Sequence, residues 1–219
     1  MRLQSSMIRL LRLGDIFSLL NLSFGFISMI FIMRGEPWFA FSFILLSALS
    51  DGADGILARK FGSGKLGENL DSLADLSSFS ISPSLLAYSS FQTIYLLPFL
   101  LVYVVCSAVR LSSFHIFKKE EWFVGLPTPA AGILLATSCM VVKDYLYISV
   151  ILIVLSMIMI SRIPYPKTDK VIGSAALVLI FMCLIFGKVF DMIFVKILLL
   201  SSLFYVLLGP LYVNMLKMR

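Results

Sequence analysis

Residues 38–58 read WFAFSFILLSALSDGADGILA, an apolar run that carries two acids near its end, Asp51 and Asp54. A second apolar run follows at 68–91, and two more acids lie near its beginning. About 20 apolar residues are needed for a helix to cross the hydrocarbon core of a membrane. The two runs therefore predict a pair of antiparallel membrane helices with carboxylates near their shared connection.

The rest of the chain repeats this alternation of apolar runs and polar breaks. Hydrophobic residues make up 60% of the 219 residues and charged residues only 14%, too little polar surface for a protein that folds in water. In lipid, a helix satisfies its own backbone hydrogen bonds. Eight apolar spans are predicted, at 15–33, 38–58, 68–91, 94–114, 126–142, 145–160, 171–187 and 192–215. The predicted fold is an all-α integral membrane protein with about eight transmembrane helices.

The basic residues predict how these helices are oriented. If both termini are cytoplasmic, most lysines and arginines fall inside, and the outside connections carry only Arg34, Lys143 and Lys188. This asymmetry follows the positive-inside rule and supports an even number of spans. The cations form no basic stripe, so no nucleic acid partner is expected, and the net charge of +6 indicates contact with anionic lipid head groups or phosphates.

The first residues of the chain have a different pattern. Leucine and methionine side chains of residues 1–14 fall near one helical face, with arginines largely on the others. This pattern predicts an N-terminal amphipathic juxtamembrane helix on the cytoplasmic surface. Residues 15–219 are then one transmembrane domain, because no repeat, linker or low-complexity tract divides them.

Four acids near the connection between the second and third spans form the candidate site. Asp51 and Asp54 are three residues apart, so they share a helix face. Asp71 and Asp75 are four residues apart and also share one. At a rise of about 1.5 Å per residue, the two pairs reach similar depths in the membrane. Ionisable residues are costly there, so they mark a functional site.

Carboxylates at this spacing repel one another, and divalent cations would offset the repulsion. All-oxygen ligation favours magnesium, manganese or calcium over zinc. Two ions about 3.5–4 Å apart would stabilise the attacking and leaving oxygens of a phosphoryl displacement. Spacing alone leaves two other interpretations open. One is the ion pathway of a transporter, and the other is a structural network with Arg59, Lys60 and Lys65.

These acids lie in a longer pattern that resembles the CDP-alcohol phosphotransferase family, D-x2-D-G-x2-A-R followed by G-x3-D-x3-D. The matching residues are Asp51, Asp54, Gly55, Ala58, Arg59, Gly67, Asp71 and Asp75. The spacer between Arg59 and Gly67 is one residue shorter than the common form, and Gly64 stands where many members have serine. The resemblance predicts an enzyme rather than a transporter or a structural network.

The resemblance implies that Asp51, Asp54 and Asp71 bind metal, and that Asp75 contacts metal and acts as the general base. The implied cofactor is Mg²⁺ or Mn²⁺, as two ions. The implied CDP-binding residues are Ser18, Asn21, Gly55, Ala58, Arg59 and Gly67. A side chain at position 55 would obstruct the nucleotide, and the guanidinium of Arg59 matches its phosphate oxygens.

Four longer stretches resemble the phosphatidylserine synthase branch of bacteria and archaea. They are 70–83, 108–115, 125–131 and 161–167. The chain departs from this branch at Ser80, where glycine is usual, and at His115, where asparagine is frequent. The resemblance implies L-serine as the acceptor, and a serine carboxylate predicts arginine partners, for which Arg110 and Arg162 are the candidates. The alternatives are a salt bridge to a motif aspartate for Arg110 and a positive-inside anchor for Arg162.

The implied reaction is a single displacement at phosphorus. The donor would be CDP-diacylglycerol or its ether-lipid counterpart CDP-archaeol, the serine hydroxyl would attack, and CMP would leave. The expected setting is the cell membrane of a prokaryote, among membrane lipids, with the active site on the cytoplasmic side of a multi-pass homodimer. The alternative is a sister enzyme that uses glycerol 3-phosphate or inositol phosphate, which would need further cations for the acceptor phosphate.

Overall fold

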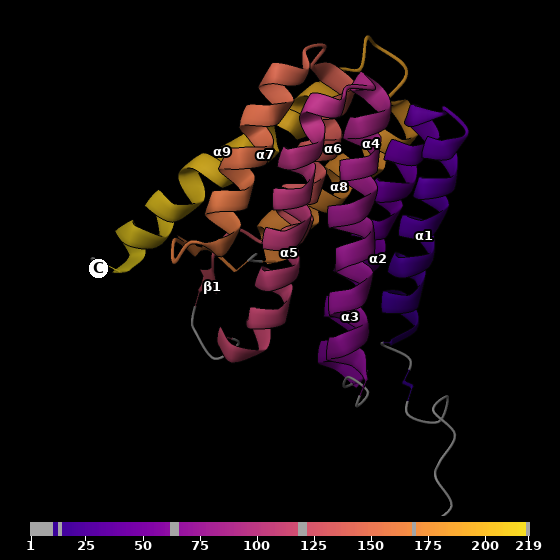
Figure 1. Ribbon diagram of the computed structural model, residues 1–219. Helices are drawn as coiled ribbons and strands as arrows, with labels where there is room; N and C mark the ends of the chain where they lie inside the picture. Colours follow the sequence, from indigo (N-terminus) through magenta and orange to yellow (C-terminus); the bar gives the residue numbers. More distant parts are fainter. Residues whose placement is uncertain (1–10, 13–14, 62–65, 118–121, 168–169, 218–219) are drawn as a thin grey trace, which may run out of the picture.

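A computed structural model describes residues 11–12, 15–61, 66–117, 122–167 and 170–217, without the side chains of 54–61, 114–117, 170–172 and 216–217. Over these residues the protein is a bundle of eight continuous helical rods joined by short connections (Figure 1). The helices are α1 (Asp15–Met33), α2 (Pro37–Phe61), α3 (Gly67–Asp75), the π-helix η2 (Leu76–Ile81), α4 (Ser82–Phe91), the 3-10 turn η3 (Ile94–Leu96), α5 (Leu97–Phe117), α6 (Thr128–Val141), α7 (Tyr145–Ile160), α8 (Lys170–Phe186) and α9 (Ile193–Lys217). The segments α3, η2 and α4 form one rod.

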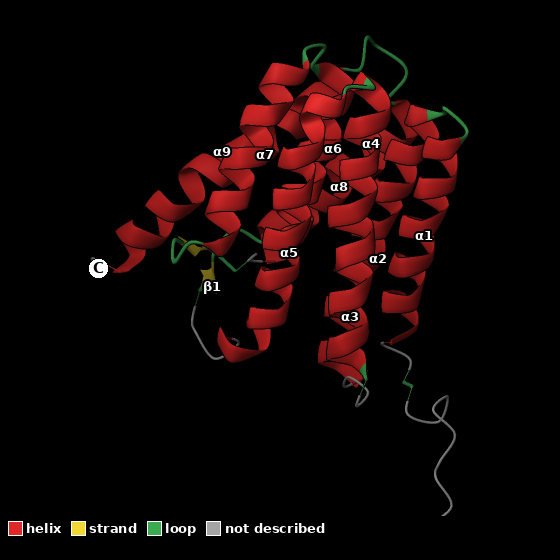
Figure 2. Ribbon diagram, in the orientation of Figure 1, coloured by secondary structure: helices red, strands yellow, loops and turns green. Residues whose placement is uncertain are grey.

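The predicted helices are confirmed in the described part of the chain, which is almost entirely helical (Figure 2). Helices α1 and α7 begin and end at the predicted residues, and the other rods differ from the prediction by at most three residues at either end. Three of the described helices, over 15–33, 94–113 and 193–215, are long and apolar enough to cross a membrane. The predicted amphipathic helix over 1–14 lies outside the described residues, apart from 11 and 12.

A short antiparallel strand pair is the exception to the predicted all-α fold. Strand β1 (Phe123–Val124) pairs with β2 (Pro164–Tyr165), at the lower end of the bundle in Figure 2. The amide of Gly125 extends the contact by donating to the carbonyl of Ile163 at 2.9 Å. Two-residue strands carry no alternating pattern, so periodicity does not predict them. The pair joins the connection before α6 to the connection after α7.

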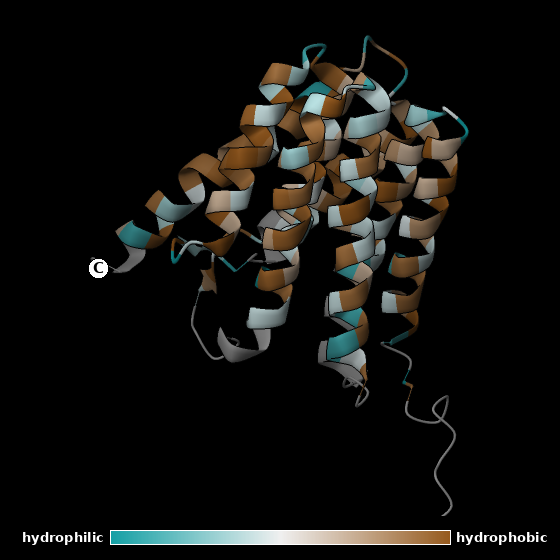
Figure 3. Cartoon of the chain, viewed as in Figure 1, coloured by the Kyte–Doolittle hydropathy of each residue, from teal (hydrophilic) through white to brown (hydrophobic). Residues whose placement is uncertain are grey.

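The outer surface of the bundle is apolar. Hydrophobic residues run along the helices, whereas hydrophilic residues gather in the connections and near the beginning of α3 (Figure 3). Large apolar side chains such as Phe26, Val105 and Leu207 are more than half exposed. Apolar surface of this extent is unfavourable in water but matches the hydrocarbon of a bilayer. The surface is that of a multi-pass membrane protein.

The π-helix η2 follows α3 because of a proline. Pro83 has no N–H, so the carbonyl of Phe79 cannot make its usual α-helical hydrogen bond. The hydroxyl of Tyr103 in α5 donates to this carbonyl at 3.0 Å instead. The amide of Ser82 bonds to the carbonyl of Ser77, five residues earlier, which is the spacing of a π-turn. The third rod therefore widens directly after the acids of α3.

Two glycines allow neighbouring helices to pack closely against η2. A Cβ at Gly132 of α6 would lie 2.5 Å from the carbonyl oxygen of Phe79, and a Cβ at Gly25 of α1 would overlap Ser78. The hydroxyl of Ser78 also donates to the carbonyl of Asn21 in α1 at 2.8 Å. Small residues and serine hydroxyls are a common means of close helix packing in membranes. Helices α1 and α6 thus hold η2 between them.

The substitution Gly132→Ala is expected to destabilise the protein, because the added methyl group meets the backbone of η2. Overpacking of this kind costs about 1–3 kcal/mol. The matched control is Gly173→Ala in α8, where a Cβ would have no atom within 4 Å and alanine favours the helix. Thermal unfolding in detergent should show a lower midpoint for the first variant only. Equal midpoints for both variants would contradict the close contact.

Candidate active site

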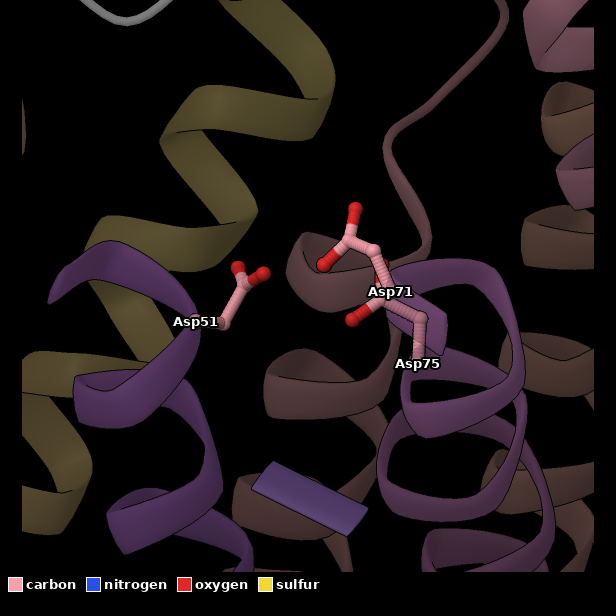
Figure 4. Close-up of side chains that lie close together, drawn as sticks. All are labelled: Asp51, Asp71 and Asp75. Carbon is pink, nitrogen blue, oxygen red and sulfur yellow. The ribbon is translucent and has the colours of Figure 1, made fainter. Parts of the chain in front are cut away.

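Three acids from two helices meet between α2 and α3. Asp51 comes from α2, and Asp71 and Asp75 come from successive turns of α3, with their carboxylates directed toward one another (Figure 4). Each acid offers a carboxylate oxygen, and these oxygens all lie within 4.8 Å of one another. Asp75 is buried, and the other two are partly buried. The structure thus brings together three of the four predicted acids.

The other motif residues of α2 have described backbone but no described side chains. They are Asp54, Gly55, Ala58 and Arg59, all within the last two turns or so of the helix. Their predicted roles stay predictions, because the positions of their side chains lie outside the described part of the structure. Gly67, the last predicted nucleotide contact, is buried at the first position of α3.

Asn21 of α1 holds one oxygen of Asp75. Its Nδ2 donates to Asp75 Oδ1 at 3.1 Å, and both side chains are buried. The hydroxyls of Ser47 and Ser78 donate to the backbone carbonyl of Asn21 at 3.2 and 2.8 Å. Hydrogen bonds from α2 and η2 therefore fix the position of Asn21. The hydrogen bond to Asp75 orients this carboxylate and leaves its second oxygen, Oδ2, for other partners.

The amide oxygen of Asn21 is an unsatisfied atom of this site. It is buried, and no residue in the described part of the chain donates to it. An unpaired buried acceptor costs about 1–3 kcal/mol, so a donor group of a bound ligand would stabilise it. Ser18, the other predicted contact in α1, is also buried and lies about one turn earlier. Both residues were predicted to contact the nucleotide, and this prediction stays open.

Arg110 of α5 brings positive charge to the same region. It is only 7% exposed, and its Nη1 donates to Oγ1 of Thr128 at 3.3 Å. The guanidinium is close enough to the carboxylate of Asp75 for the two opposite charges to attract each other. Arg162, by contrast, is exposed just after the end of α7. Of the two predicted acceptor arginines, Arg110 is the one that the described structure places in electrostatic contact with an acid of the cluster.

The donor atoms of the cluster fit a hard divalent cation. All three side chains offer oxygen, which Mg²⁺, Mn²⁺ and Ca²⁺ prefer. Ligands on opposite sides of Mg²⁺ lie about 4.2 Å apart. The carboxylate oxygens lie within 4.8 Å of one another, so small side-chain rotations would bring them into reach of one ion. The aspartate cluster therefore has the composition and size of a metal site.

Two residues of η2 and α6 that bond to residues of the site were not predicted from the sequence. Ser78 donates a hydrogen bond to the carbonyl of Asn21, and Thr128 accepts one from Arg110. Ser78 and Thr128 lie in stretches that resemble the phosphatidylserine synthase branch. That resemblance was the feature of the sequence that could have pointed to them.

Comparison with known proteins identifies the family. The chain matches the model of the CDP-alcohol phosphatidyltransferase family over residues 11–161, which include all three acids, Asn21 and Arg110. It is 34% identical to the CDP-diacylglycerol–serine O-phosphatidyltransferase of Methanocaldococcus jannaschii, over 73% of this chain and 76% of the relative. It is 36% identical to the archaetidylserine synthase of Methanothermobacter thermautotrophicus, over 75% and 73% of the two chains. It is also 37% identical to the CDP-diacylglycerol–serine O-phosphatidyltransferase of Bacillus subtilis, over 58% and 75%. The protein belongs to the CDP-alcohol phosphatidyltransferase family.

Proposed function

We propose that this enzyme transfers a phosphatidyl or archaetidyl group from a CDP-activated lipid to L-serine and releases CMP. The observation that carries the proposal is the convergence of Asp51, Asp71 and Asp75 in a chain of this family. Two similar enzymes, from Methanocaldococcus jannaschii and Bacillus subtilis, are named for CDP-diacylglycerol and serine. The similar archaetidylserine synthase supports CDP-archaeol as the alternative donor.

The aspartate cluster is proposed to hold Mg²⁺ or Mn²⁺, as two ions, with Asp54 as a further ligand beside Asp51. When bound, the metal would neutralise the pyrophosphate of the donor and stabilise the charge that develops on the departing CMP. The spacing supports this role for Asp54, since a residue three positions after Asp51 falls on the same face of α2.

The donor nucleotide is proposed to lie between α1, α2 and α3. Gly55, Ala58 and Gly67 would let it approach the backbone closely, and Arg59 would bind the pyrophosphate. Ser18 and Asn21 would contact the cytidine. The buried, unsatisfied oxygen of Asn21 supports this assignment, because the exocyclic amino group of cytosine is a hydrogen-bond donor.

Asp75 is proposed to act as the general base. It would take the proton of the serine hydroxyl as that oxygen forms a bond to the lipid-bearing phosphorus and the bond from this phosphorus to the CMP oxygen breaks. Asn21 supports the role by occupying Oδ1, which leaves Oδ2 for the proton. Arg110, buried and in electrostatic contact with Asp75, would bind the serine carboxylate, with Arg162 as a second candidate.

The proposed setting is the cell membrane of a prokaryote, with eight spans and a homodimeric assembly. Both termini and the active site would be cytoplasmic. The beginnings of α1 and α3 and the end of α9 all lie toward the lower end of the bundle, which supports this topology (Figure 1). A site at the membrane boundary would let a water-soluble acceptor meet a lipid donor.

The acceptor is tested by CMP release from the purified protein with CDP-diacylglycerol or CDP-archaeol and Mg²⁺. Serine, glycerol 3-phosphate and inositol phosphate are compared, and the lipid product is identified by mass spectrometry. The expected result is CMP release with serine and a product that contains serine. Release only with a phosphorylated alcohol would overturn the serine assignment. No release with any acceptor from either donor would overturn the proposed function.

A further inference from the structure

Thr128, the first residue of α6, is fully buried and bonds to Arg110. Its Oγ1 accepts a hydrogen bond from Nη1 of Arg110 at 3.3 Å. A guanidinium buried away from water needs such acceptors, because an unpaired charged donor is costly there. Helix α5, which carries Arg110, packs against α3 and η2, and these two segments meet at Asp75. The position of Thr128 therefore constrains one nitrogen of a guanidinium beside the aspartate cluster.

The connection before Thr128 is itself fixed on the end of α7. Gly125 has a φ of +75°, in the left-handed region that favours glycine, and a Cβ there would overlap the carbonyl oxygen of Met159. The amide of Gly125 donates to the carbonyl of Ile163 at 2.9 Å. Pro127, directly before Thr128, has its φ fixed by its ring. Little freedom is therefore left in the backbone that leads into α6.

The last helix, α9, supports the same connections. Tyr165 of β2 pairs with Phe123 of β1, and its hydroxyl donates to the carbonyl of Val206 in α9 at 2.9 Å. This carbonyl lacks its usual helical donor because Pro210, four residues later, has no N–H. Gly209 leaves room for the approach, since a Cβ there would lie 3.1 Å from the Tyr165 ring. The two connections and α9 thus form one hydrogen-bonded unit.

We propose that Thr128 is a positioning residue for Arg110 and thereby sets the affinity of the enzyme for its acceptor. Its hydroxyl oxygen holds the guanidinium in the orientation in which the other N–H groups meet the carboxylate of a small amino-acid alcohol. A guanidinium binds a carboxylate in a fixed fork geometry, so its orientation affects the affinity. The unit formed by β1, β2 and α9 keeps Thr128 in place. This inference rests on the proposed function, because Arg110 is the proposed acceptor-binding group.

The test is Thr128→Val, which removes the hydroxyl and keeps nearly the same side-chain shape. The KM for serine is expected to rise about tenfold, the effect of losing one hydrogen bond to a charged group. The KM for the CDP-lipid and the kcat should change little. The conservative variant Thr128→Ser keeps the hydroxyl, so its KM for serine should stay near the wild-type value.

The matched control is Thr137→Val in the same helix. Thr137 is as fully buried as Thr128, but its hydroxyl donates within α6, to the carbonyls of Ile133 and Leu134 at 2.7 and 3.0 Å. This variant loses a hydroxyl from the same helix without changing the surroundings of Arg110. Its KM for serine should equal that of the wild type.

Several outcomes would overturn this inference alone, in a wild type that releases CMP with serine. One is a wild-type KM for serine in Thr128→Val. Another is an equal rise of KM for both substrates in that variant, or the same rise in Thr137→Val, since either shows a general packing effect. Loss of the unfolding transition in Thr128→Val would show a structural requirement instead. A wild type that releases no CMP with serine overturns the proposed serine transfer and, with it, this inference.

Discussion

Replacement of Asp75 by asparagine is expected to lower the kcat for CMP release by about 10²–10⁴-fold, the usual contribution of a general base. An amide cannot take the proton of the acceptor hydroxyl. Its oxygen can still accept the hydrogen bond from Asn21, so the variant should fold. The measurement is kcat with saturating serine and CDP-diacylglycerol, together with the thermal unfolding midpoint in detergent.

The control for this variant is Glu68→Gln, which removes a negative charge from an exposed position in the first turn of α3. It should retain the wild-type kcat, because Glu68 is not among the acids of the cluster. An Asp75→Asn variant that kept a kcat near the wild-type value would exclude Asp75 as the base. A variant that lost both activity and its unfolding transition would show a structural requirement instead.

Removal of divalent ions is expected to abolish CMP release, and added Mg²⁺ or Mn²⁺ is expected to restore it. The substitution Asp51→Asn should lower the rate by about a hundredfold or more at any metal concentration, because it removes a charged oxygen ligand while keeping the side-chain shape. The measurement is the rate of CMP release as the metal is titrated into protein that was treated with EDTA.

Two results would contradict the metal assignment. One is full activity of the wild type in excess EDTA. The other is an Asp51→Asn variant with the same metal dependence as the wild type. The Glu68→Gln variant again serves as the control, since it should respond to the metal as the wild type does.

The positions of the helices were predictable because each apolar run is bounded by polar or proline-containing breaks. Helix α7, for example, extends from Tyr145 to Ile160, the predicted bounds, between the connections that contain Asp144 and Ser161. The convergence of the acids was predictable for a similar reason. A spacing of three or four residues places side chains on one face, and a short connection brings the two faces together.

The effects of the prolines were only partly predictable. Pro83 and Pro210 each deprive a carbonyl of its helical partner, which the sequence alone implies. The sequence does not say which group replaces that partner. The donors are Tyr103 and Tyr165, from other helices and connections, and their positions depend on tertiary packing.

The contacts that orient the site were not predictable for the same reason. Asn21 lies 54 positions before Asp75, and the hydrogen bond between them needs the close packing of α1 on the third rod. Tyr165 reaches the carbonyl of Val206 only because α9 packs on β2. No local sequence pattern predicts such pairs. The sequence therefore identifies the reactive acids but not the hydrogen bonds between distant residues that orient the site.

The most direct test of the metal site is Mn²⁺ binding to the purified protein, measured by electron paramagnetic resonance with and without CMP. The wild type and Glu68→Gln are expected to bind Mn²⁺. A folded double variant, Asp51→Asn with Asp71→Asn, is expected not to bind it. A wild type that binds no Mn²⁺, or a double variant that binds it as tightly as the wild type, would contradict a metal site at the aspartate cluster.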